Sequence, residues 1–172
     1  MFTTERPALE RLAQSRSDGT IPRRGSVTVE LAMVVPLLVF LLFAILEFGL
    51  LVQRRSELGQ AAREGTRQAA VGATPTRIAA EVASVTGTLD PALLTQSYTF
   101  RVWNAATSTW GPWQTLGVND TGTENNASSG NQVRVRLEYR HRLLLPGLMG
   151  QVMHADEDGY LTVVAATVMM RE

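Results

Sequence analysis

The sequence contains no cysteine and no lysine, and its only histidines are His141 and His154. Without cysteine the chain can form no disulfide, thiolate metal site or cysteine nucleophile, and two histidines are too few for a conventional zinc site. All 16 basic residues are arginine, and they balance 16 acidic residues. The net charge therefore gives no electrostatic reason to expect nucleic acid as a partner.

Motifs of enzymatic chemistry are also missing. No glycine pattern fits a phosphate-binding loop, and no serine lies in a G-x-S-x-G turn that could work with His154 and Asp156 or Asp158. The segment Asp156–Gly159 is superficially calcium-like but lacks the ligand spacing of an EF-hand, so we interpret it as an acidic turn. We therefore expect no enzyme, no catalytic residue, no metal and no cofactor.

A long apolar run dominates the N-terminal part. Every residue from Leu31 to Leu46 is apolar, and after Glu47 the run continues to Val52. At about 1.5 Å per residue, residues 31–52 measure roughly 33 Å as a helix, against a hydrocarbon core of about 30 Å. Pro36 lies inside the run, but spanning helices tolerate proline. The sequence predicts one membrane-spanning helix over about 31–52.

Two questions about this helix stay open on composition alone. Four arginines lie within about 20 residues of the run on each side, so the positive-inside rule gives no orientation. Glu47 would cost several kcal/mol in hydrocarbon. Either it reaches the headgroup region from its place near the end of the run, or it is a functional acid with a cationic partner.

The residues before the run carry a second acid in a specific context. Arg23, Arg24 and Gly25 precede Ser26–Val29, and Glu30 follows directly before the apolar residues. This resembles the type III signal of type IV pilins and pseudopilins, in which a prepilin peptidase cuts after the glycine and the glutamate is the fifth mature residue. Counted from Ser26, Glu30 is the fifth residue. The resemblance implies that residues 1–25 are a leader that is removed.

Cleavage at Gly25 would have a chemical consequence for Glu30. The new α-amine of Ser26 would have a pKa of roughly 8 and be cationic at neutral pH. In a bundle of such helices, Glu30 could pair with that amine on a neighbouring subunit and set the axial registration during assembly.

A longer segment, residues 24–72, resembles the TadE-like family, minor pseudopilins of tight-adherence (Flp pilus) systems. The matching positions are a V-E-L-A start, a proline within the span, an E-F-G near its end and an A-A-R-E-G-x-R segment beyond it: Val29, Glu30, Leu31, Ala32, Pro36, Glu47, Phe48, Gly49, Ala61, Ala62, Arg63, Glu64, Gly65 and Arg67. Thr66 replaces the usual alanine. The resemblance implies a cytoplasmic leader and an extracytoplasmic C-terminal part.

Beyond the apolar run the helix is expected to continue to about residue 72. Small residues at three- and four-residue spacings, among them Ala62 and Gly65, form a stripe for packing against the following domain. We interpret Arg63 and Glu64 as solvated helix charges. Thr74 and Pro75 then predict the start of a second helix, with Thr74 as N-cap and Ile78, Val82 and Val85 as its buried stripe.

The remaining chain has strand periodicity. Alternation predicts strands at 98–103 and 133–140, a turn at Gly111-Pro112, a long polar loop over 117–131 and a last strand over 160–170, buried on both faces or paired with the long helix. The outer face of the second strand carries Arg134, Arg136 and Arg140, and these arginines with the tryptophans could contact a polyanion or sugar, or be ordinary surface charges.

These observations predict an α+β fold, with a long helix over 26–72 and a small antiparallel-sheet domain over 73–172 outside the cytoplasmic membrane. The family resemblance implies a non-enzymatic minor pseudopilin that takes part in assembly or initiation of a Flp pilus. Its implied partners are a prepilin peptidase, other pilins and pseudopilins, the assembly platform and membrane lipid, with no nucleic acid. The alternative is an extracytoplasmic binding module that stays anchored by an uncut leader.

Overall fold

The structure, a computed structural model, describes residues 24–172, with side chains from Val27 onward except that of Leu148. The chain divides into two compact units, one ending at Leu41 and one comprising Leu42–Glu172. Helix α1, Arg24–Ala70, contributes to both. The predicted leader lies outside the described residues as far as residue 23.

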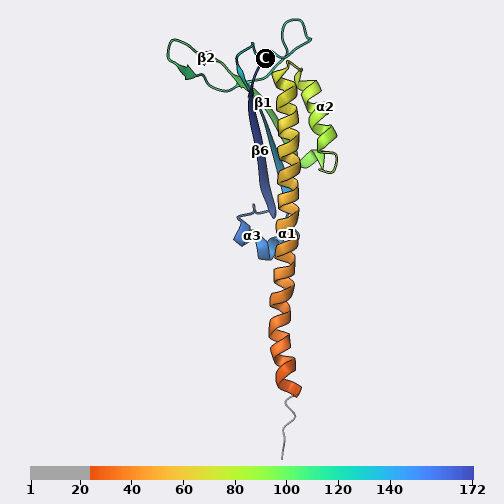
Figure 1. The fold of residues 1–172 in the computed structure, drawn as a ribbon. Coiled ribbons are helices and arrows are strands. Elements are labelled where there is room, and N and C mark those ends of the chain that lie inside the picture. Colours follow the sequence, from red (N-terminus) through yellow and green to blue (C-terminus); the bar gives the residue numbers. More distant parts are fainter. Residues whose placement is uncertain (1–23) are drawn as a thin grey trace, which may run out of the picture. The chain divides into compact units, whose positions relative to one another are not determined.

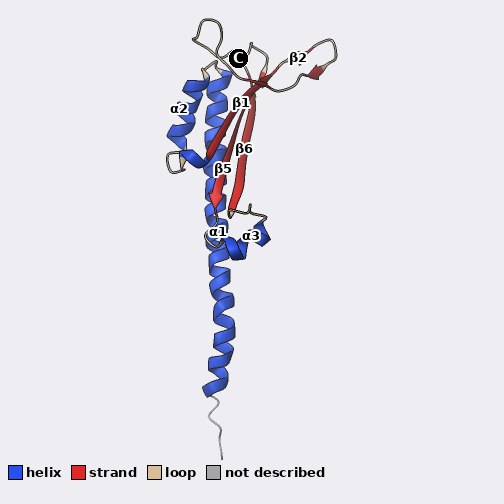
Figure 2. Cartoon of the chain, turned by 180° about the vertical axis from the view of Figure 1, so that it is seen from behind, coloured by secondary structure: helices blue, strands red, loops and turns tan. Residues whose placement is uncertain are grey.

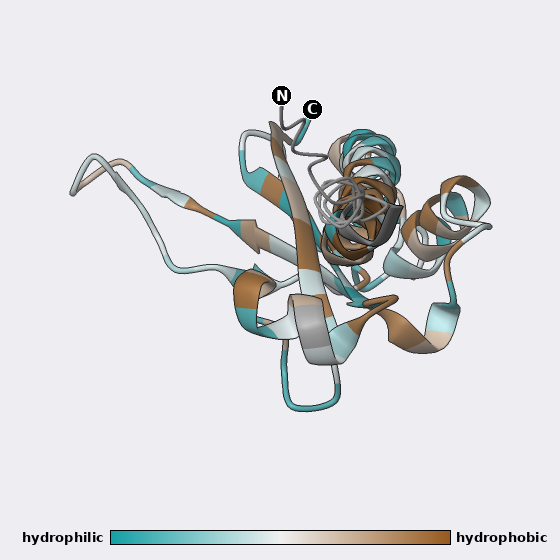
Figure 3. Cartoon of the chain, turned by 90° about the horizontal axis from the view of Figure 1, so that it is seen from below, coloured by the Kyte–Doolittle hydropathy of each residue, from teal (hydrophilic) through white to brown (hydrophobic). Residues whose placement is uncertain are grey.

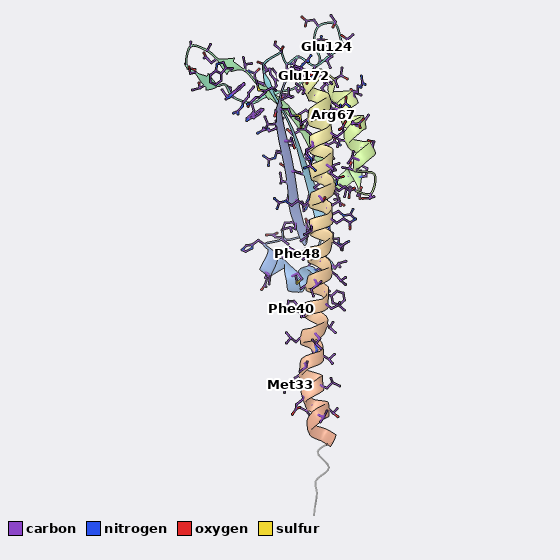
Figure 4. The ribbon with its side chains drawn as sticks, viewed as in Figure 1. Met33, Phe40, Phe48, Arg67, Glu124 and Glu172 are labelled. Carbon is purple, nitrogen blue, oxygen red and sulfur yellow. The ribbon has the colours of Figure 1, made fainter. Side chains whose placement is uncertain are left out.

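The described part of the first unit is the beginning of α1. Its apolar side chains are exposed except that of Phe40, which is half-buried, and Figure 4 shows Met33 projecting from the helix. Among the described residues, this is the one helix that is long and apolar enough to cross a membrane, judged by length and composition. The helix continues through Pro36 without a break, as spanning helices allow.

The second unit contains an antiparallel sheet of four strands in the order β4-β1-β5-β6 (Figures 1 and 2). The predicted α+β fold with a long N-terminal helix is confirmed. The sheet strands are β1 (Leu94–Arg101), β4 (Gln114–Thr115), β5 (Gln132–Arg142) and β6 (Tyr160–Met170). A separate hairpin is formed by β2 (Trp103–Asn104) and β3 (Thr109–Trp110). The other helical elements are α2 (Pro75–Val85), a short 3-10 helix (Pro91–Leu93) and α3 (Pro146–Met153).

The core forms where one face of the sheet meets α1 and α2, which lie on the same side of it (Figure 3). Its fully buried members come from the small-residue stripe of α1, from α2 and from the inward positions of β5: Leu58, Ala61, Ala62, Ala69, Ile78, Val82, Val133, Val135 and Leu137. Helix α2 begins as predicted, since the Thr74 hydroxyl accepts a hydrogen bond from the backbone N–H of Arg77. Small side chains on α1 let both neighbours approach closely.

Gly65 marks the closest of these approaches. A Cβ atom at this position would lie 2.9 Å from Cγ2 of Val82 on α2 and 3.4 Å from Cγ1 of Val135 on β5. A real Cβ does not occupy such a space, so α2 or β5 would have to shift. The glycine of the helix motif is thus required by packing between three elements.

The polar loop over 117–131 is present, but it is anchored in a way that its composition did not reveal. Asn125 is buried, and its side-chain amide donates to the carbonyls of Ala69 (2.8 Å) and Ala73 (3.1 Å). Its backbone N–H donates to the carbonyl of Gly72, whose φ of +93° ends α1. Asn125 therefore binds one carbonyl of the last turn of α1, at Ala69, and two carbonyls just beyond the helix, and so fixes the loop to the C-terminal end of α1.

Of the two alternatives predicted for β6, burial on both faces is wrong, whereas packing against the long helix agrees with the contact of Thr66 on α1 with the carbonyl oxygen of Thr167. The residues of β6 alternate between half-buried and exposed, and the half-buried Val163, Ala165 and Met169 pack on the core. The exposed residues of β6 lie on the sheet face opposite α1 and α2, where the outward residues of β5 are also exposed or half-buried, and as an edge strand β6 has a strand neighbour on one side only. The first predicted strand also begins earlier than expected, at Leu94, and ends at Arg101, so Val102 is exposed.

Matched alanine substitutions at two glycines of α1 test the close approach at Gly65. Both Gly65→Ala and Gly59→Ala gain about 1 kcal/mol of helix propensity, but only Gly65→Ala overpacks the core, because the nearest atom to a Cβ at Gly59 is Nη1 of Arg63 at 3.7 Å. We expect Gly65→Ala to be less stable than Gly59→Ala by about 1–3 kcal/mol. Thermal unfolding in detergent micelles measures this difference, and equal stabilities would contradict the packing argument.

Candidate functional site

Glu47 is the first residue after the uninterrupted apolar run, and its side chain is only 1% exposed. Its Oε1 lies 2.9 Å from Nε2 of His141, near the end of β5. Its Oε2 accepts a hydrogen bond of 2.8 Å from the backbone N–H of Leu144, in the turn before α3. A buried carboxylate is costly unless it is hydrogen-bonded, and both of its oxygens are satisfied here by groups from distant parts of the chain.

Through these two hydrogen bonds Glu47 connects α1 with the end of β5 and with the turn before α3. His141 is 8% exposed, and its Nε2 shares a hydrogen bond with Oε1 of Glu47. The structure thus gives Glu47 a protein partner in place of the lipid headgroups considered above. The sequence indicated that His141 would have such a partner. His141 continues the inward positions of Val135, Leu137 and Tyr139, and a buried histidine needs a polar partner.

The predicted cleavage and registration residues lie in the first turns of α1. Gly25 and Ser26 are helical, and Glu30 is exposed. Glu30 and Glu47 stand 17 positions apart in the same helix, so the two acids occupy different sites. At Gly49 a Cβ atom would meet nothing within 4 Å, so packing among the described residues does not explain this glycine.

The helix motif around residue 62 divides between two faces of α1. Ala62 is fully buried. Glu64 and Arg67 lie on the surface, where Nε of Arg67 donates to Oε2 of Glu64 at 3.0 Å. This hydrogen bond lowers the pKa of Glu64 and raises that of Arg67. Arg63 lines a groove of about 490 Å³ between α1 and β6.

Thr66, the departure from the usual alanine, has a structural use. It is fully buried, and its hydroxyl lies 2.6 Å from the carbonyl oxygen of Ala62 and 3.3 Å from that of Thr167 on β6. The hydroxyl therefore adds a polar contact between α1 and the edge strand.

The acidic turn before β6 has protein partners for its first carboxylate. Asp156 accepts a hydrogen bond from the backbone N–H of Tyr160 and pairs with Arg140 at 2.7 Å, and these contacts lower its pKa, the backbone bond contributing most. Within residues 24–172 no group of three acids or histidines is arranged to hold a metal. His154 is exposed at the C-terminal end of α3, and no hydrogen bond between described residues joins it to Asp156.

Comparison with known proteins adds one finding. A family model described as TadE-like protein matches residues 25–67, which confirms the resemblance predicted from the V-E-L-A and A-A-R-E-G patterns over that part of the chain. The matched segment starts at Gly25 and ends at Arg67, so it includes Glu30, Glu47 and Gly65. No curated protein and no solved structure matches the chain significantly.

Removal of the Glu47 carboxylate tests whether its contacts with His141 and Leu144 stabilise the fold. Glu47→Ala leaves His141 buried and the Leu144 N–H without an acceptor, so we expect a loss of roughly 3 kcal/mol of unfolding free energy. Glu64→Ala, which breaks the exposed pair with Arg67, is the control and should cost less than about 1 kcal/mol.

Hydrogen exchange at the Leu144 amide gives a local measurement. In Glu47→Ala this amide should lose its protection, whereas in Glu64→Ala it should keep it. Unchanged protection at Leu144 in Glu47→Ala would show that the hydrogen bond does not hold the turn.

Proposed function

Because residues 25–67 match the TadE-like family, which indicates involvement in a tight-adherence (Flp) pilus system, we propose that the chain is a minor pseudopilin of such a system. It takes part in assembly or initiation of the pilus and carries out no enzymatic reaction. The observation that carries the proposal is the coincidence of the family match, which begins at Gly25, with an exposed apolar helix over the same residues.

The burial of Glu47 supports a particular placement of the helix in the membrane. If residues from Glu47 onward belong to the sheet domain, the segment left for the hydrocarbon is Val27–Leu46. These 20 residues measure about 30 Å at 1.5 Å each, which equals the thickness of a typical hydrocarbon core. This placement shifts the membrane span from the predicted residues 31–52 to residues 27–46. Glu30 then lies about one helical turn inside the span.

An acid at this depth needs a cationic partner, and leader removal would create one. A prepilin peptidase cuts after Gly25, and the released α-amine of Ser26, with a pKa of roughly 8, is cationic at neutral pH. Glu30 of one subunit pairs with this amine on its neighbour and fixes the axial register of the helices. The exposed apolar side chains then pack against other pilins, the assembly platform or lipid.

In this arrangement the leader is cytoplasmic and the sheet domain is extracytoplasmic. The rival proposal, a permanently anchored binding module, shares the helix and the domain but keeps the leader. The two therefore differ at the N-terminus of the mature chain and in whether Glu30 is needed for assembly.

The absence of lysine makes the first difference easy to measure. The α-amine is the only primary amine of the unmodified chain, so an amine-reactive reagent applied to protein from the native host labels the N-terminus alone. We expect the label on a peptide that begins with Ser26. A label on Met1 in protein from the native host would establish the permanent anchor instead.

Substitutions separate cleavage from assembly. Gly25→Leu should block trimming, because its side chain obstructs the approach of the peptidase to the backbone. Glu30→Ala should leave trimming intact and reduce pilus assembly by more than about tenfold, the factor that corresponds to losing ~1.4 kcal/mol of pairing. Glu64→Ala is the control acid outside the span. Normal piliation with Glu30→Ala would refute the registration role.

A further inference from the structure

All three tryptophans of the chain lie in one cluster with two arginines, where the β2–β3 hairpin projects from the sheet (Figure 1). The Trp103 and Trp110 rings meet edge to face with centroids 5.2 Å apart. The Arg101 guanidinium lies 4.6 Å from the centroid of Trp113 and 5.2 Å from that of Trp110. The Arg134 guanidinium lies 4.0 Å from the centroid of Trp113. We call these five residues the Trp–Arg cluster.

The two guanidinium groups of the Trp–Arg cluster lack an acidic partner. Farther along the same sheet face, Arg136 pairs with Glu138 and Arg140 pairs with Asp156. Among the described residues, no carboxylate forms an ion pair with Arg101 or Arg134. The cluster therefore holds two adjacent positive charges that the chain itself does not neutralise.

The hydrogen bonds of these arginines leave their outer donors available. Nε of Arg101 donates to Oε1 of Gln132 (2.8 Å), and Nε of Arg134 donates to the hydroxyl of Thr99 (3.1 Å). No other hydrogen bond involves either guanidinium within residues 24–172. Each arginine is thus fixed by its Nε bond and its aromatic stack while its two terminal amino groups have no acceptor.

The electrostatics agree with this geometry. Burial lowers the pKa of Arg134 first, and the neighbouring charges of Arg136 and Arg101 lower it further. A cluster that served only to fasten the hairpin would need aromatic contacts and one cation. Two unneutralised cations beside each other raise the energy of the chain until an anion approaches.

We propose that the Trp–Arg cluster binds an anionic glycan through a sugar carboxylate. The planar guanidinium fork matches a carboxylate with two parallel hydrogen bonds, and the terminal amino groups of Arg101 and Arg134 supply these donors. Trp103 is 44% exposed and offers an aromatic face on which the apolar C–H face of an adjacent sugar ring packs.

The extent of the charge favours a glycan over nucleic acid. A nucleic acid carries a phosphate at every nucleotide, and its binding sites use a cationic track along the backbone. Here the unpaired charge ends after two residues, since Arg136 and Arg140 already have acidic partners. A polymer whose acid groups are separated by neutral sugar units fits this local site, and its binding does not depend on leader removal.

Intrinsic fluorescence provides the test, because every tryptophan that contributes to the emission belongs to the cluster. The full chain in detergent micelles is titrated with a hyaluronan oligosaccharide, in which each glucuronate is separated from the next by a neutral amino sugar, and in parallel with its methyl ester as the uncharged match. We expect a saturable change in emission with the acid and none with the ester. Arg101→Gln and Arg134→Gln should each weaken binding by roughly tenfold or more, the effect of losing a charge-assisted bidentate contact.

Arg77→Gln is the matched control, since Arg77 is exposed on α2, has no ion pair among the described residues and loses the same charge. Its affinity should equal that of the unmodified chain. Far-UV circular dichroism checks that each variant is folded. If a variant fails to fold, the comparison of the acid with its ester on the unmodified chain still tests the proposal. The proposal is overturned by unsaturable titrations, by equal binding of the ester, or by oligothymidylate that binds as tightly as the acid.

Discussion

The buried carboxylate of Glu47 is the constraint on which the arrangement of the second unit depends. A charge at the end of an apolar run must either reach water or find partners inside the protein. In this chain it finds His141 at 2.9 Å and the Leu144 N–H at 2.8 Å. The end of β5 and the turn before α3 are therefore fixed against α1 at the level of Glu47.

Patterns within one element could be predicted from the sequence, and pairings between distant elements could not. The apolar run, the Thr74 cap of α2, the inward alternation of β5 and the small-residue stripe each depend on neighbours a few positions away. Glu47 and His141 are 94 residues apart, and Asn125 caps a helix that ends more than 50 residues before it. Only the inward position of His141 pointed to such a partner. The burial of β6 was overestimated because hydropathy does not reveal that a strand lies at a sheet edge.

The family-matched segment serves two tasks that the structure separates along α1. In its outer half, Ala62, Gly65 and Thr66 face the sheet domain, so their small size and the Thr66 hydroxyl are explained by contacts within the chain. In its inner half, the apolar side chains are exposed, and their burial requires lipid or other molecules. One part of the motif therefore encodes folding of the domain, and the other is consistent with assembly in a membrane.

The position of β6 has a consequence for symmetry. This edge strand contains no charge and no proline over 11 residues, and its free N–H and C=O groups are a template on which another chain can pair. It runs in the same direction as α1, as the contacts of Thr66 with Thr167 and of Ala70 with Glu172 show. Antiparallel pairing needs a two-fold axis across the strands, which would turn one copy upside down. Two chains inserted with the same orientation in one bilayer cannot meet in that way, so insertion would exclude antiparallel pairing at this edge and leave only parallel pairing.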